Sequence, residues 1–211
     1  MKTPQLKLHI LKSDKRILPF VQQITSIAKE TFKQVNKLLP FKEPVDIVVY
    51  RYIAHDPEFA TSGYTPTGNV LWIYTDPTQK EYKKLLQNQL TRVLSHELHH
   101  ACRIQYLGMS KTLQDALVFE GLAAHFESEI TAQQPSQFYT QFDNKKLRAL
   151  LLKARSDINN EKYSYDDWFF GNNKRNIPKH AGYGMSYFMV EEALKGRKPS
   201  ELVNRKTGQI L

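Results

Sequence analysis

The alternation of apolar and polar residues divides the first half of the chain into strand-like segments. Residues 6–11, LKLHIL, alternate with the period of two that is typical of a half-buried strand. Residues 45–52, VDIVVYRY, and 70–75, VLWIYT, are rich in β-branched and aromatic residues, which favour strands. The intervening SGYTPTGN, residues 62–69, combines Gly, Pro, Ser and Asn and predicts a turn. The pattern therefore predicts a small sheet.

Apolar residues with a spacing near 3.6 predict helices along the rest of the chain. Proline or glycine follows the first two of them, and neither residue continues a helix readily. Ser110 or Thr112 can cap the third through a side-chain oxygen. The predicted helices cover residues 18–39, 79–107, 112–131, 141–155 and 184–195. The whole pattern indicates an α+β fold in which a small mixed sheet packs on one long helix and a mainly helical C-terminal part follows.

Length and composition favour one domain. A chain of 211 residues with 41% apolar content can bury one substantial core, so we expect a single domain over residues 1–211. Within it, a basic strand and helix occupy 1–40, the sheet and two central helices 45–130, and the helical part 140–211. No apolar run is long enough for a transmembrane segment or a signal peptide, and the single Cys102 cannot form an internal disulfide. We therefore expect a cytoplasmic protein.

The formal charge of +9 is unevenly distributed. Residues 1–40 and 138–211 each carry a net charge of +6, whereas residues 41–137 carry −3. The basic residues form no block of five or six and accompany no nucleic-acid-binding motif, so a solvated basic surface is expected rather than a nucleic-acid interface. The two basic ends leave open an acidic partner or an anionic membrane surface.

The segment RVLSHELHHACR, residues 92–103, carries the clearest chemical pattern. His96, Glu97 and His100 form His-Glu-x-x-His within the long predicted helix. Residues four apart lie on one face of a helix, with Cβ atoms about 5–6 Å apart, so two imidazoles there can bind one cation. Zinc accepts such nitrogens and needs at least one further protein ligand.

The position of these residues on the helix supports a metal site. Glu97 projects from the middle of the apolar stripe, and His96 and His100 lie toward one edge of it. The stripe consists of Leu86, Leu90, Val93, Leu94, Ala101 and Ile104. Burial of these polar groups without partners would cost several kcal/mol, which a divalent cation offsets. His99 lies on the other side of the helix and is expected at the surface or in a second layer of the site.

The next predicted helix offers candidates for a third ligand. Glu120 lies within the apolar stripe of the segment LQDALVFEGLAAHFESE, and Gly121 beside it begins a small-residue surface on which another helix could approach closely. His125 and Glu127 are alternatives. His125 is rotated well away from Glu120 and favours a structural role, and Glu127 lies two turns further on, where a surface or supporting position is expected.

These motifs resemble a known peptidase clan. His-Glu-x-x-His, then nineteen residues and a glutamate, resembles the gluzincins, typified by thermolysin. HELHH and EGLAAHFE are similar to a bacterial family of zinc-dependent proteases of unknown function. The flanking SGYTPTGNVLWIYTDP and HAGYGMSYFMVEEAL extend this similarity to residues 45–196. The resemblance implies a zincin-like fold and one zinc per chain, held by His96, His100 and Glu120. Ala124 departs from thermolysin, which has an aspartate there that supports a ligand histidine.

The resemblance also implies hydrolysis of peptide bonds, with Glu97 as general base and a peptide or protein as substrate. His180 and Tyr183 are candidate donors to the developing oxyanion, and Tyr183 lies between two glycines that would let the backbone turn sharply. Tyr187 is a further candidate. The resemblance places the substrate-binding sheet edge at 70–75. The alternatives are a zinc hydrolase of another amide and a metal-stabilised regulatory or binding protein.

Overall fold

The structure, a computed structural model, describes residues 5–53 and 59–211 of the chain. Residues 1–4, at the start of the basic N-terminal segment, lie outside the described residues. The chain folds as two compact units, residues 1–108 and 109–211, so the single domain expected over 1–211 stays a prediction. Within the described part of the chain, no helix has both the length and the apolar character that crossing a membrane requires.

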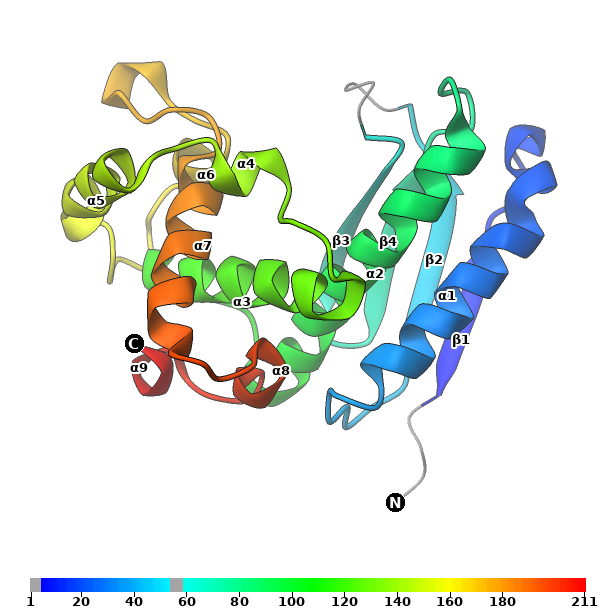
Figure 1. The fold of residues 1–211 in the computed structure, drawn as a ribbon, viewed down its shortest axis with the longest axis horizontal. Coiled ribbons are helices and arrows are strands. Elements are labelled where there is room, and N and C mark those ends of the chain that lie inside the picture. The colour runs from blue at the N-terminus through cyan, green and yellow to red at the C-terminus, as the bar shows by residue number, and fades with distance from the viewer. Residues whose placement is uncertain (1–4, 54–58) are drawn as a thin grey trace. The chain divides into compact units, whose positions relative to one another are not determined.

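The first unit contains a mixed four-stranded sheet (Figure 1). Its strands are β1 (Leu6–Ile10), β2 (Val45–Arg51), β3 (Thr61–Thr67) and β4 (Val70–Thr75), in the order β1-β2-β4-β3. The first three in that order are parallel, and β3 is antiparallel to β4. The three predicted strands and the small mixed sheet are thus confirmed.

The prediction of a turn over SGYTPTGN is wrong in most of its length. Strand β3 covers Thr61–Thr67, and only Gly68 and Asn69 form the turn that joins it to β4. Pro66 is compatible with β3 because an outermost strand needs hydrogen bonds on one side only. The expected sheet edge at 70–75 is also wrong, since β4 lies between β2 and β3.

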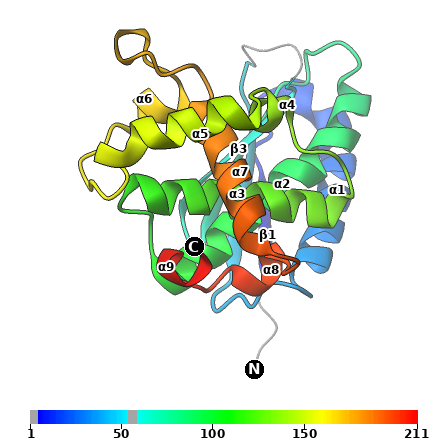
Figure 2. The same ribbon diagram turned by 60° about the vertical axis from the view of Figure 1, so that its left-hand side comes forward.

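Two helices cover one face of this sheet. Helices α1 (Val21–Val35) and α2 (Tyr82–Leu107) contact each other, and they reach β1 and β3 respectively (Figures 1 and 2). A short 3-10 helix, η1 (Lys15–Phe20), precedes α1. Successive residues of a strand point to opposite faces of the sheet. Leu71 and Ile73 are accordingly fully buried, whereas Trp72 between them is 39% exposed. The buried residues on this face include Val45, Ile47, Val49, Leu71 and Ile73.

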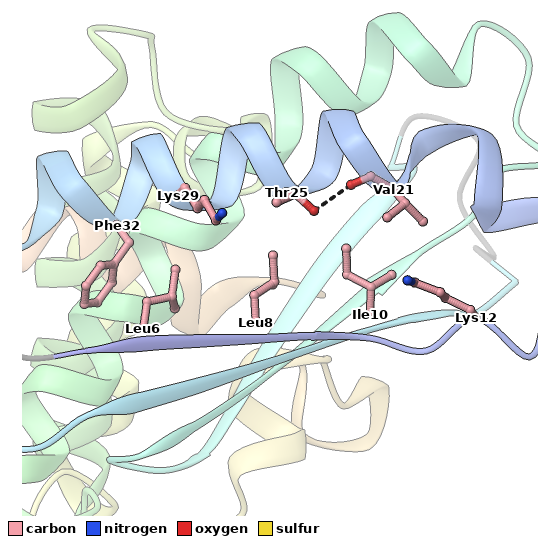
Figure 3. A pocket seen from close by; sticks show the side chains of 8 residues that line it. All are labelled: Leu6, Leu8, Ile10, Lys12, Val21, Thr25, Lys29 and Phe32. Atoms are coloured by element: carbon pink, nitrogen blue, oxygen red, sulfur yellow. Dashed lines mark hydrogen bonds between the residues drawn. The ribbon is translucent and has the colours of Figure 1, made fainter.

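A groove of about 610 Å³ separates part of β1 from α1. In Figure 3, Leu6, Leu8 and Ile10 point from β1 toward the helix, where the Thr25 hydroxyl donates a hydrogen bond to the Val21 carbonyl at 2.7 Å. The other lining residues are Lys12, Lys29 and Phe32. These β1 side chains are only half-buried. The groove therefore lies at the end of the sheet farthest in strand order from β3.

The second unit is helical, as the pattern predicts for this part of the chain. Its two longer helices are α3 (Leu113–Thr131) and α7 (Ala181–Leu194), which contact each other. The shorter elements are α4 (Gln137–Thr140), α5 (Asn144–Lys153), η2 (Ala154–Ser156), α6 (Tyr165–Phe169), η3 (Asn173–Arg175), α8 (Pro199–Leu202) and α9 (Thr207–Ile210). Thr112 caps α3 by accepting a hydrogen bond from the Asp115 amide, which confirms one of its two predicted caps.

Glycine at position 121 allows α3 and α7 to approach closely. A Cβ atom added at Gly121 would lie 2.3 Å from the Ser186 carbonyl oxygen and 2.5 Å from Val190 Cγ2. No residue with a side chain fits at such distances without movement of the backbone. The small-residue surface expected beside Glu120 is therefore confirmed, and α7 is the helix that it accommodates.

Candidate metal centre

Helix α2 brings His96, Glu97 and His100 together on two successive turns. The segment forms one uninterrupted helix of 26 residues because it contains no Gly or Pro and carries the apolar residues that cover the sheet. The imidazole centroids of His96 and His100 lie 4.5 Å apart, with their planes at 86°. His100 is buried. The i, i+4 arrangement expected for a histidine pair is thus present.

Glu97 is held against strand β3. Its side chain is buried, with 7% of the residue exposed. The Thr65 hydroxyl donates a hydrogen bond to Glu97 Oε2 at 2.6 Å, and a Cβ atom at Gly63 would lie 2.5 Å from Glu97 Cγ. Sequence reasoning missed both β3 residues, because it assigned them to a turn rather than to a strand next to α2.

Glu120 lies on α3 and has a hydrogen-bond donor within the second unit. The Tyr165 hydroxyl donates to Glu120 Oε1 at 3.2 Å. Burial raises the pKa of Tyr165 well above its ordinary value, and the Glu120 charge and Tyr183 raise it further. The phenol therefore stays protonated and remains a donor. Tyr165 follows the helix cap Ser164 in a short helix, α6, within a polar and aromatic segment whose pattern did not single it out.

His125 has a structural role within the second unit. Its Nε2 donates to the Tyr187 carbonyl at 3.1 Å, and the two rings stack with centroids 3.9 Å apart. Burial lowers the pKa of His125. This placement agrees with the structural role favoured for His125. Glu127 and His99 are both buried, so the surface alternative is wrong for each, and a supporting position in a second layer stays a prediction.

His180 and Tyr183 lie at the start of α7. His180 immediately precedes the helix with φ of +65°, in the left-handed region, whereas Tyr183 is part of its first turn. The sharp turn predicted at Tyr183 is therefore wrong. The flanking glycines serve close packing instead: a Cβ atom at Gly182 would lie 2.7 Å from the Phe169 ring, and one at Gly184 would lie 3.0 Å from another aromatic side chain.

Comparison with known proteins agrees with the chemistry of these residues. A family described as "Predicted Zn-dependent protease (DUF2268)" matches residues 24–211. The uncharacterized protein YjaZ of Bacillus subtilis (strain 168) is 29% identical over 118 residues, which are 53% of this chain and 44% of that protein. The chain thus matches less than half the length of this relative. The family match includes both helices that carry the histidine pair and Glu120, and the chain belongs to this family of predicted zinc-dependent proteases.

Proposed function

We propose that the protein is a zinc-dependent peptidase that holds one zinc ion through His96, His100 and Glu120. Two imidazoles and a carboxylate are a donor set that could hold a metal ion, and they leave a fourth position of tetrahedral zinc for water or substrate. The histidine pair is preorganised by α2, and the Tyr165 hydroxyl orients the Glu120 carboxylate. These features support a catalytic rather than a fully coordinated structural site.

The reaction divides between the metal and the protein. Zinc, when bound, supplies a Lewis acid that polarises the substrate carbonyl and lowers the pKa of water. Glu97 accepts the proton of the attacking water and delivers it to the leaving amine, so the amide C–N bond breaks and a C–O bond forms. Tyr183 and His180 are the proposed donors to the oxyanion. An extended peptide would bind by adding to β3, the outermost strand on the side of α2.

One observation carries this proposal: a buried carboxylate, Glu97, follows the first histidine of an i, i+4 pair and is fixed by a hydrogen bond. A metal that only stabilises the fold has no use for a general base at this position. Burial of a carboxylate is costly, and a hydrogen bond offsets only part of that cost. The arrangement therefore favours hydrolysis over the regulatory alternative.

The test compares metal content and turnover in matched variants. Protein purified without chelators or metal-binding tags is assayed by elemental analysis and by cleavage of fluorescein-labelled casein. We expect about one zinc per chain in the wild type, as in catalytic zinc sites. Glu120→Ala should lose most of the zinc, whereas Glu192→Ala, a change on the exposed surface of α7, should retain it. Glu97→Gln should retain zinc and lose casein cleavage.

Each result has a defined meaning. Undiminished cleavage by Glu97→Gln would exclude a glutamate general base. Undiminished zinc retention by Glu120→Ala would exclude Glu120 as third ligand and direct attention to Glu127, a buried glutamate two turns further along α3.

A further inference from the structure

The two oxygens of the Glu97 carboxylate have different environments. The Thr65 hydroxyl lies 2.6 Å from Oε2 and 3.1 Å from the Glu97 carbonyl oxygen. A hydroxyl has one hydrogen to donate, and the shorter contact to a charged acceptor is the stronger. Oε2 therefore takes this hydrogen bond. Within residues 5–53 and 59–211, no hydrogen bond to Oε1 is observed.

Strand β3 also fixes the path of the Glu97 side chain. A Cβ atom at Gly63 would lie 2.5 Å from Glu97 Cγ and 2.9 Å from both Cδ and Oε1. The side chain therefore rests on the bare backbone of Gly63, two residues before Thr65 on the same face of the strand. Any larger residue at position 63 would push the carboxylate away from its present place.

We infer that Thr65 and Gly63 are positioning residues that make Oε1 of Glu97 the oxygen that accepts the proton in the reaction. The inference rests on the proposed function and deepens it. Thr65 occupies one oxygen and thereby fixes the rotation of the carboxylate, and Gly63 provides the space in which the other oxygen lies. Fixing a general base in this way removes rotational freedom that would otherwise be lost during the reaction. The strand proposed to bind the substrate thus also orients the base.

Acetohydroxamic acid tests this inference without knowledge of the natural substrate. When its two oxygens bind a zinc ion, it releases its hydroxyl proton, and a carboxylate beside the metal strengthens binding by accepting that proton. In the site proposed here the O–H bond of the acid breaks and an Oε1–H bond forms on Glu97. Its affinity for zinc-loaded protein, measured by titration calorimetry, therefore reports the placement of the base independently of catalytic turnover.

The variants separate the hydroxyl from the bulk of the side chain. We expect Thr65→Val to bind acetohydroxamic acid about 10- to 100-fold more weakly, the usual effect of losing such a supporting group. Thr65→Ser keeps the donor and should bind within about threefold of wild type. Gly63→Ala should weaken binding as Thr65→Val does. Thr61→Val is the matched control, because Thr61 is a buried threonine on the same face of β3 whose hydroxyl makes no hydrogen bond to Glu97. Zinc content is measured for every variant.

The outcomes distinguish the inference from the proposed function. Wild-type affinity in Thr65→Val, or equal weakening in Thr65→Val and Thr65→Ser, overturns the inference. If Glu97→Gln binds as tightly as wild type, or if zinc-loaded wild type does not bind the acid, the proposed function itself fails. Weak binding by Glu97→Gln together with unchanged binding by Thr65→Val leaves the proposed function standing and removes only the role of Thr65.

Discussion

Substitution of alanine for Gly121 measures how closely α3 and α7 approach. The added Cβ would lie 2.3 Å from the Ser186 carbonyl oxygen, which is 1.1 Å short of the 3.4 Å at which ordinary contact begins. The atom that it meets belongs to the backbone, so the two helices must separate. Overpacking of a core typically costs about 1–3 kcal/mol, and we expect the upper end because a helix has to move.

Alanine also stabilises a helix relative to glycine, and this gain in the free energy of unfolding offsets part of the overpacking cost. It is a better helix former than glycine by roughly 1 kcal/mol. The expected net change for Gly121→Ala is therefore a loss of about 2 kcal/mol in the free energy of unfolding. For a chain of this size, this corresponds to a fall of roughly 4–8 °C in melting temperature.

Thermal unfolding followed by circular dichroism measures this fall. Gly208→Ala is the control, because Gly208 also lies in a helix, α9, and a Cβ atom there meets nothing within 4 Å. The control should melt at the wild-type temperature or slightly above it. If Gly121→Ala melts at the same temperature as this control, close packing of α7 at position 121 does not limit the size of the side chain there.

Two further predictions concern the second unit. Tyr165→Phe should weaken zinc affinity roughly 10- to 100-fold while the protein stays folded, because Glu120 loses its hydrogen-bond donor. Competition with a chelator measures the zinc affinity, and an affinity equal to that of the wild type would contradict this prediction. Hydrogen bonds from Arg175 hold the pKa values of Asp157 and Asp167 below their ordinary range. The two ion pairs therefore stabilise the fold fully above the pKa of an aspartate in the unfolded chain, about 3.9. This stabilisation is lost as the pH falls through the lower pKa values of the two aspartates in the folded chain. Arg175→Gln should therefore lower the melting temperature at pH 7, and the melting temperature of the variant should fall less than that of the wild type between pH 7 and pH 2. An equal fall in the melting temperature of both proteins over this range would contradict the prediction.

The local part of the site could be predicted from the sequence. His96 and His100 are four residues apart within a segment without Gly or Pro, so helix geometry alone places them on one face. The apolar stripe likewise predicted that Glu97 would be buried, and it is. The histidine pair and its neighbouring carboxylate thus depend only on the regular repeat of a helix.

The neighbours of these residues depend on tertiary structure. Thr65 and Glu97 are 32 residues apart, and only the packing of β3 on α2 brings them into contact. Tyr165 is 45 residues from Glu120 and lies in a short helix with no periodic pattern. Turn-forming residues also obscured β3, because Gly63 and Pro66 have roles there that depend on the adjacent helix and on the strand's outermost position.

Regular repeats within single segments therefore predict the longer helices, three of the four strands and the shared face of His96 and His100 on α2. Tertiary packing, by contrast, places β3 at one edge of the sheet, the Thr65 hydroxyl against Glu97 and the Tyr165 hydroxyl against Glu120. A hydrogen bond between distant residues depends on how whole elements pack, and no local pattern of apolar and polar residues encodes that contact.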